Sequence, residues 1–194
     1  MPVITLVLLT LSLLSVALLS VSNGAFAIPL ADSMRVLVAF VGFGDASVLD
    51  PGQYGVLTEI RVPRTIMAGF VGAGLSVSGA LMQGLFRNPL ADPGLLGVSS
   101  GAALGAALII VLGTSLGLNH TWALPIAAFA GAVISTVAVM KLSSVQGRTI
   151  VATMLLAGIA INAIAGAGTG VLVYLADDDQ LRDLTFWTLG SFGG

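Results

Sequence analysis

The sequence has no cysteine, a single histidine and few charged residues, and each of these shortages excludes a class of function. Without cysteine, the 194-residue chain forms no disulfide, no thiolate metal site and no cysteine nucleophile. With His120 alone, it cannot build a metal motif from paired histidines. Charged residues make up 8% of the chain, whereas a typical soluble domain has about 25%. A soluble chain of this size would therefore have too little polar surface to cover its exterior.

Sequence signatures of enzymes are absent as well. The chain has no HExxH zinc motif, no GxSxG nucleophile motif and no GxxxxGK[ST] phosphate loop. The long apolar segments contain no ionisable residue, so they predict neither a proton relay nor an ion-coupling carboxylate. No run of basic residues indicates nucleic acid, and the formal net charge is −2. We therefore predict no catalytic residue, no metal site, no cofactor and no nucleic-acid partner.

Long apolar segments make up most of the sequence. Hydrophobic residues make up 57% of the chain, and the mean hydropathy is +1.06. Segments of about 20 apolar residues match the roughly 30 Å hydrocarbon core of a bilayer. The sequence therefore predicts an all-α polytopic membrane protein with one transmembrane domain over residues 1–194. About five transmembrane helices are expected, followed by the start of a sixth, with the spans at residues 3–22, 65–86, 95–112, 122–140 and 149–176.

The first apolar segment has two interpretations. Residues 25–27, Ala-Phe-Ala, look like a signal-peptidase site, which would make the segment a cleaved signal peptide. However, it has no positively charged start and is longer than a usual signal core, which favours a retained transmembrane helix. Residues 23–60 would then lie outside the membrane. Within them, residues 33–40 are predicted to form a short amphipathic helix with Asp32 as its N-cap.

Small residues recur at four-residue intervals in three of the spans. Such stripes allow the backbones of neighbouring membrane helices to approach closely. Gln83 and Asn162 are polar side chains on these spans, and they are expected either to bond to a neighbouring helix or to line a pathway. Ser99 and Ser100 are expected to bond to carbonyls of their own helix. The predicted packing positions are Gly72, Gly97, Gly101, Gly105, Gly158, Gly166 and Gly170.

Several longer motifs follow one another in a fixed order. The first motifs are RVPR at residues 61–64, VGA at 71–73, SGA at 78–80, Gln83 and RNPLADP at 87–93. The later motifs are LGVSSGA at 96–102, LLAGIA at 155–160 and FWTLGS at 186–191. Together they closely resemble the FecCD-type permeases. These are the membrane subunits of bacterial ABC importers for iron–siderophores, haem and vitamin B12. The resemblance covers nearly the whole chain.

The resemblance implies a fold, an orientation and a set of partners. Family subunits have ten transmembrane helices in the type II importer arrangement, so this chain is similar to their amino-terminal half. The lysine and arginine distribution does not decide the orientation, but the resemblance implies a cytoplasmic amino terminus and an extracytoplasmic segment 23–60. It also implies residence in the bacterial cytoplasmic (inner) membrane. The expected partners are an ATP-binding cassette ATPase subunit, a periplasmic or lipid-anchored substrate-binding protein and a second permease copy, all within or beside the lipid bilayer.

The resemblance also implies docking, gate and pathway roles for individual positions. Arg61 and Arg64 match periplasmic arginines that pair with acidic residues of the binding protein, and guanidinium groups bind carboxylates well. The alternative is that both side chains simply reach for the membrane interface at a helix start. Asn88 and Leu90 match positions of the cytoplasmic gate. The span at residues 149–176 is expected to line the translocation path at the dimer axis.

Three functions remain to be weighed from the sequence. The motif series favours a permease of a binding-protein-dependent ABC importer for iron–siderophores or related metal chelates such as haem and cobalamin. The alternative is a truncated, non-transporting permease remnant or membrane scaffold. A secondary transporter would need an ion-coupling acid inside a span, and none is visible.

Overall fold

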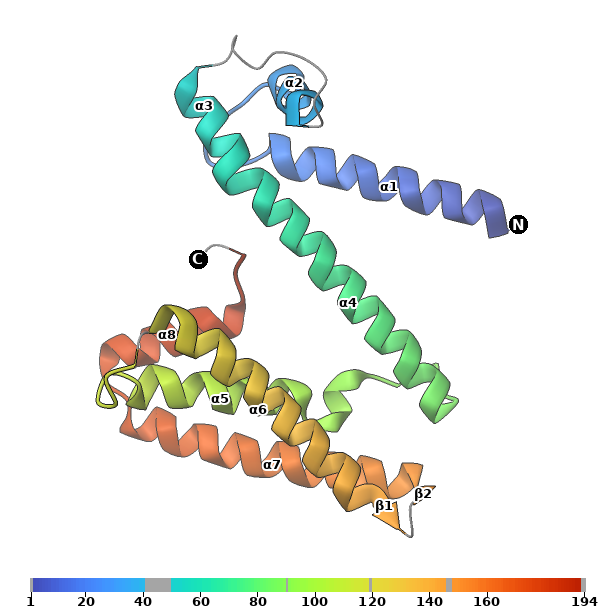
Figure 1. Ribbon diagram of the computed structural model, residues 1–194, viewed down its shortest axis with the longest axis vertical. Helices are drawn as coiled ribbons and strands as arrows, with labels where there is room; N and C mark the ends of the chain where they lie inside the picture. Colours follow the sequence, from blue (N-terminus) through green and yellow to red (C-terminus); the bar gives the residue numbers. More distant parts are fainter. Residues whose placement is uncertain (1, 41–49, 90, 119, 146–147, 193–194) are drawn as a thin grey trace. The chain divides into compact units, whose positions relative to one another are not determined.

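Helices make up almost all of the computed structural model, which describes residues 2–40, 50–89, 91–118, 120–145 and 148–192 (Figure 1). The chain divides into two compact units. The first unit contains residues 1–74 and 192–194, and the second contains residues 75–191. The expected single transmembrane domain over residues 1–194 stays a prediction. Each unit is described separately below.

In the first unit, a small apolar cluster brings three segments together. Helix α1 (Pro2–Ser22) is followed by α2 (Leu30–Phe40), and the chain resumes with α3 (Pro51–Gly55). The buried members of the cluster come from the end of α1, from α2 and the residues before it, and from the helix that continues after α3; they are Val21, Ile28, Val36, Leu57 and Val62. The rest of α1 is exposed and apolar, as expected of a helix that faces lipid.

The amphipathic helix predicted at residues 33–40 exists, but its predicted N-cap is wrong. Helix α2 begins at Leu30, so Asp32 lies inside the first turn and does not precede the helix. The Asp32 carboxylate instead accepts a hydrogen bond from Arg35 at 3.0 Å, in an i, i+3 ion pair on the helix surface. An aspartate in the first turn still interacts favourably with the helix dipole, which explains why it fits there.

One long helix runs through the second predicted span. Helix α3, the π-helical turn η1 (Val56–Arg61) and α4 (Val62–Phe86) follow without interruption, from Pro51 to Phe86. The N–H of Val62 bonds to the carbonyl of Leu57, five residues back. The proline at position 63 explains this wider turn, because its ring collides with the carbonyl four residues earlier in an ordinary α-helix. The helix therefore starts well before residue 65, where the sequence places the span.

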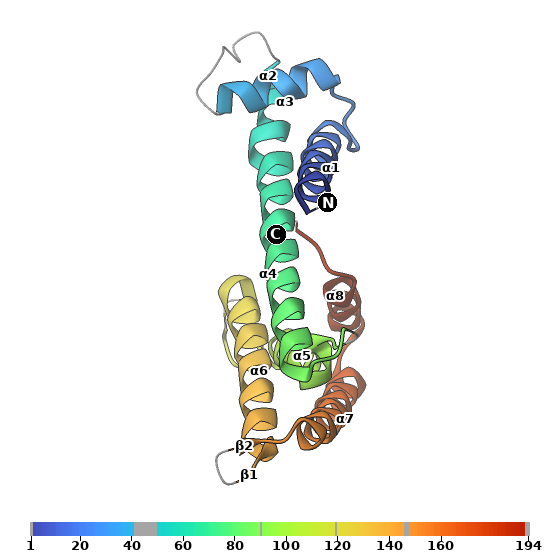
Figure 2. The same ribbon diagram turned by 90° about the vertical axis from the view of Figure 1, so that its right-hand side faces the viewer.

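In the second unit, a central short helix packs between two long ones. Helix α5 (Val98–Leu112), preceded by the 3-10 turn η2 (Pro93–Leu96), contacts both α6 (His120–Ser143) and α7 (Val151–Leu175), as Figures 1 and 2 show. A two-residue antiparallel pair, β1 (Ser144–Val145) with β2 (Arg148–Thr149), connects α6 to α7. The sequence predicts only a tight hydrophilic loop there.

Helix α8 (Asp178–Leu189) closes the second unit through a capping box. The Asp177 side chain accepts from the Gln180 N–H at 2.8 Å, and the Gln180 side chain accepts from the Asp177 N–H at 3.1 Å. Gln180 also donates from Nε2 to the carbonyl of Val111 at 3.2 Å, near the end of α5. Leu184 of α8 is buried in the same cluster as Val111. These contacts fix α8 against α5.

Within the described residues, four helices are long and apolar enough to cross a membrane: Val3–Ser22, Pro51–Phe86, Thr121–Ser143 and Val151–Leu175. Helix α5 is apolar but has 15 residues. At 1.5 Å per residue it is about 22 Å long, shorter than the roughly 30 Å hydrocarbon core. The predicted all-α polytopic membrane fold is confirmed, with one of its five spans shorter than a full crossing.

Candidate functional site

The RNPLADP segment forms a tight reversal at the end of α4. Arg87 has a positive φ of 48°, and two hydrogen bonds close the helix end around it. The Arg87 N–H bonds to the carbonyl of Gly84 at 3.4 Å, and the Asn88 N–H bonds to that of Gln83 at 3.2 Å. This is the Schellman pattern of helix ends, with arginine at the position that usually holds glycine. The Ala91 N–H then bonds to the Asn88 carbonyl at 3.1 Å.

The reversal leads into η2 through two residues with specific backbone roles. The Asp92 side chain accepts from the Gly94 N–H at 2.7 Å and caps the turn. Gly97 ends the turn with a φ of 77°, which favours glycine. A Cβ at Gly97 would also lie 3.0 Å from Ile161 on α7. The backbone conformation therefore favours glycine here, and a larger residue would also have to displace the Ile161 side chain slightly.

Asn162 of α7 binds the start of α5 and the turn before it. Its Oδ1 accepts a hydrogen bond from Ser100 Oγ at 2.5 Å, and its Nδ2 donates to the carbonyl of Gly94 at 3.4 Å. Ser100 Oγ also lies 3.2 Å from the carbonyl of Gly97. Both side chains are half-buried. The structure thus joins three elements through one amide, and Asn162 makes helix-to-helix contacts as the sequence analysis allowed.

The position of Asn162 along α7 gives this contact its significance. Asn162 lies eleven residues after the start of α7 at Val151, or about 16 Å along the helix. The whole helix is about 37 Å long, so its middle lies within any 30 Å hydrocarbon core that the helix crosses. The 3-10 turn η2, which interrupts the α-helical path between α4 and α5, packs against this middle part of α7. Inside a membrane, such an interruption is tolerated only where protein groups or a water-filled cavity satisfy its backbone.

Glycines allow α5 to approach α6 with almost no space between the backbones. A Cβ at Gly101 would overlap the carbonyl oxygen of Gly131, and one at Gly131 would overlap the carbonyl of Gly101. A Cβ at Gly105 would overlap the carbonyl of Ala127. Two of the predicted packing glycines, Gly101 and Gly105, thus lie at a close helix crossing.

The glycines of α7 and α4 divide into two groups. A Cβ at Gly158 would overlap the carbonyl of Leu95 in η2, so this glycine lets η2 lie directly on α7. Gly72 of α4, and Gly166 and Gly170 of α7, have no atom of another element within 4 Å of a Cβ built on them. The role of these three glycines as helix-packing positions stays a prediction.

Arg61, in the first unit, is not the exposed group that the sequence predicts. Its side chain is buried, with the residue 8% exposed. The guanidinium donates to the carbonyls of Val21 at 3.0 Å and Ser22 at 2.9 Å, and to that of Phe26. A Cβ at Gly24 would lie 2.7 Å from a guanidinium nitrogen. Carbonyls at the end of α1 and just beyond it accept three hydrogen bonds from this guanidinium, and the docking role of Arg61 stays a prediction.

The other predicted site residues lie on exposed surfaces. Arg64 is exposed near the start of α4, and Gln83 is exposed near its end. Asn88 is exposed in the reversal. Leu90, the second predicted gate residue, lies outside the described residues. Arg64 therefore meets the accessibility that docking requires, whereas Arg61 does not.

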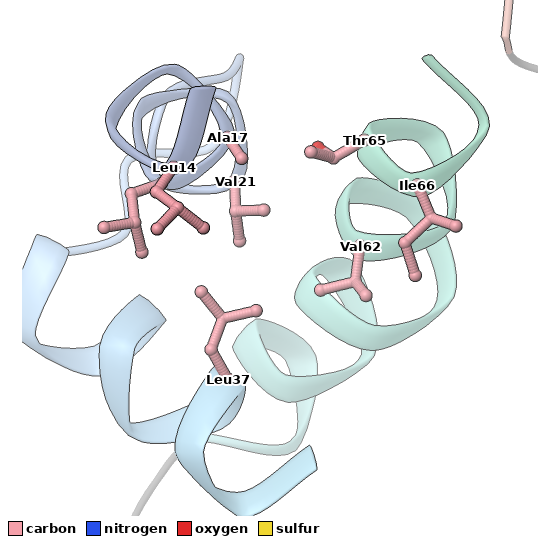
Figure 3. A pocket seen from close by; sticks show the side chains of 8 residues that line it. Leu14, Ala17, Val21, Leu37, Val62, Thr65 and Ile66 are labelled. Carbon is pink, nitrogen blue, oxygen red and sulfur yellow. The ribbon is translucent and has the colours of Figure 1, made fainter. Parts of the chain in front are cut away.

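An apolar cavity of about 280 Å³ lies beside Arg61 in the first unit. Side chains from α1, α2 and the start of α4 point into it, among them Leu14, Leu37 and Ile66 (Figure 3). Thr65 is the one polar side chain in its lining, and the Thr65 hydroxyl is 2.9 Å from that of Ser20. The cavity thus has no charged or unpaired polar group that would select a chelate. Among the described residues, no group of three or more histidine, cysteine or acidic side chains could hold a metal ion.

A comparison with models of known protein families identifies the family of this chain. The model of the FecCD transport family matches residues 9–194. The chain belongs to the FecCD transport family. It is accordingly a multi-pass protein of the bacterial cytoplasmic membrane.

Curated FecCD relatives include permeases for two kinds of chelate. The chain is 50% identical to the hemin transport system permease protein HmuU of Yersinia pestis over 142 residues. It is 43% identical to the vitamin B12 import system permease protein BtuC of Escherichia coli over 136 residues. These alignments cover 73% and 70% of this chain but 42% and 40% of the relatives. The chain thus spans about two fifths of the length of these curated relatives.

A solved structure supports the fold over almost the full chain. A metal-chelate type ABC transporter in an inward-facing conformation matches with a TM-score of 0.76 and 30% sequence identity. The match covers 99% of this chain and 54% of the other. Both this fold and the family were predicted from the motif series.

Three residues that make these helix contacts were not predicted from the sequence. Ser100 was expected to bond only within its own helix, but it bonds to Asn162 of α7. Gly131 and Ser135 of α6 meet Gly101 at the helix crossing. The spacing of Ala127, Gly131 and Ser135 at four-residue intervals could have revealed the second pair, since it is the same small-residue stripe. The Ser100 contact joins residues 62 positions apart, and no local pattern encodes it.

Proposed function

We propose that the chain forms part of the permease of a binding-protein-dependent ABC importer for metal chelates. The substrates in this class are haem, cobalamin and iron–siderophore complexes. The observation that carries the proposal is the FecCD family match over residues 9–194, together with relatives that are permeases for hemin and vitamin B12. The permease itself would not hydrolyse ATP. A separate ATPase subunit would supply the energy, because the apolar segments predicted from the sequence hold no acidic residue for ion coupling.

Arg64 is the proposed docking residue for the substrate-binding protein. Its side chain is exposed, it follows the segment 23–60 that we propose to be extracytoplasmic, and a guanidinium can engage a carboxylate through two parallel hydrogen bonds. The buried Arg61 would support this surface indirectly, because it fixes the end of α1 next to it.

The proposed inner gate is the reversal at residues 87–93 together with the turn η2 that follows it. Asn88 and Leu90 are its proposed gate positions. Helix α7 is the proposed wall of the translocation path, and a second permease copy would face it. The open sides of Gly166 and Gly170 support this placement, because α7 has a small-residue surface there that no other described element covers.

An uptake rescue tests the proposed function. The complete permease, its ATPase and its binding protein are expressed in a bacterial strain that lacks its own chelate permeases. Growth on haem, on cobalamin and on ferric siderophores is then compared. Rescue with at least one chelate, dependent on the ATPase, supports the proposal. Absence of rescue by all three, with the complex present in the membrane, would refute it.

A charge reversal tests the docking residue separately. Arg64→Glu in the complete permease should weaken binding of the binding protein at least tenfold, because it replaces an attraction by a repulsion. Arg35→Glu is the matched control, since Arg35 is also exposed but already pairs with Asp32. Affinity is measured by surface plasmon resonance on complexes in lipid nanodiscs. Equal weakening by both variants would indicate a general charge effect and exclude a specific site at Arg64.

A further inference from the structure

The contact around Asn162 does more than fill space between helices. The 3-10 turn η2 packs against the middle of α7, a helix long and apolar enough to cross a membrane, where buried backbone groups need partners from the protein. Asn162 Nδ2 donates to the carbonyl of Gly94 at 3.4 Å, which also accepts from the Gly97 N–H at 3.2 Å. Its other end accepts from Ser100, the third residue of α5. One side chain of α7 therefore holds both the turn and the helix that follows it.

Packing around this amide excludes sliding of the turn along α7. Gly158 lies one helical turn before Asn162 and lets the Leu95 carbonyl rest directly on α7. Leu96 and Ala91 are buried in one apolar cluster with Met154 and Ala157 of α7. The turn is thus fixed by backbone contact on one side of Asn162 and by apolar burial nearby.

We propose that Asn162 and Ser100 form a polar latch that makes the turn at residues 91–97 and α7 move as one body. In this arrangement Asn162 is a positioning residue, which acts on the proposed gate through the backbone of η2. The latch itself follows from the contacts, whereas its role in transport rests on the proposed function. Its consequence is mechanical: a displacement of α7 during the transport cycle is passed directly to the reversal that holds Asn88.

Hydrogen exchange tests the latch without any transport. The measurement uses the complete permease complex in nanodiscs and follows the amides of residues 91–97. Ser100→Ala removes one hydrogen bond and should speed their exchange about threefold, since an interhelical bond in a membrane contributes modestly. Asn162→Leu removes both bonds at similar volume and should speed exchange about eightfold, if the two contributions add.

Two controls separate the latch from general destabilisation. Thr136→Val on α6 removes a half-buried hydroxyl that bonds only to its own helix, at the Ala132 carbonyl. It should leave exchange at residues 91–97 unchanged. Ser100→Thr keeps a hydroxyl and should restore protection to the wild-type level. Asn162→Leu with wild-type exchange rates would overturn the latch.

Coupling of transport to ATP tests the mechanical role. In proteoliposomes, the number of chelate molecules taken up per ATP hydrolysed should fall at least threefold in Asn162→Leu, while Thr136→Val retains the wild-type ratio. The double variant Ser100→Ala, Asn162→Leu should be no worse than Asn162→Leu alone, because both act on one contact. Faster exchange with an unchanged uptake ratio would overturn the mechanical role but not the latch. A wild-type complex that transports no chelate would instead count against the proposed function, and the exchange result would stand.

Discussion

The buried arginine of the first unit gives a prediction that opposes the simplest family-based expectation. Arg61 donates to three backbone carbonyls, and two of them belong to the last residues of α1. A hydrogen bond to a charged group contributes about 1.5–3 kcal/mol when buried. Water can replace part of each bond here, because residues 23–27 are exposed. We therefore expect Arg61→Met, which keeps the apolar stem, to weaken the contact of α1 with α4 by about 3 kcal/mol.

A disulfide assay measures this loss directly. Ser20 Oγ and Thr65 Oγ1 lie 2.9 Å apart, and the chain holds no native cysteine to interfere. Ser20→Cys with Thr65→Cys should form a disulfide quickly when Arg61 is intact. A 3 kcal/mol loss corresponds to about a hundredfold change in a closing equilibrium, so oxidation in the Arg61→Met background should be at least tenfold slower.

Arg64→Met is the matched control in this assay. Its side chain is exposed, so oxidation should proceed at the original rate. Binding-protein affinity should show the opposite order, with Arg64→Met the weaker variant. Equal oxidation rates in the two backgrounds would refute the reasoning that Arg61 fixes the end of α1.

Further predictions concern the close helix contacts of the second unit, all measured as thermal stability of the complete permease. Gly101→Leu should destabilise by about 3 kcal/mol or more, because its side chain would overlap Gly131, and a neutral effect would contradict the helix crossing. Gly97→Ala should cost about 1–2 kcal/mol for its positive φ alone, so a neutral effect would contradict the left-handed turn. Asp92→Ala should cost about 1 kcal/mol through loss of the cap on η2, whereas Asp92→Asn should retain most of the stability.

Much of the fold could be predicted from the sequence because hydropathy is a local property. The spans expected at residues 3–22, 122–140 and 149–176 lie within a few residues of α1, α6 and α7. The ordered motifs also predicted the family correctly. Two boundaries were missed where backbone geometry decides: the helix beginning at Pro51 and the break at Gly97 that shortens α5.

The candidate site was harder to predict because its contacts join distant parts of the chain. Arg61 carries the same local pattern as Arg64, yet one is buried against α1 and the other is exposed. A pattern of residues 61–64 cannot report the position of carbonyls 35–40 residues earlier. The glycine stripe of α7 shows the same limit, since Gly158 meets η2 whereas Gly166 faces open space. Spacing identifies a surface that permits close packing, but the tertiary fold decides what covers it.

Uptake by purified components tests the central claim most directly. The complete permease is reconstituted in liposomes with its ATPase, and the binding protein loaded with radiolabelled haem or cobalamin is added outside. We predict that uptake requires both ATP in the liposome lumen, on the side of the ATPase, and the loaded binding protein outside. Collapse of the proton and sodium gradients should leave the uptake unchanged. Uptake driven by an ion gradient in the absence of ATP would contradict the account.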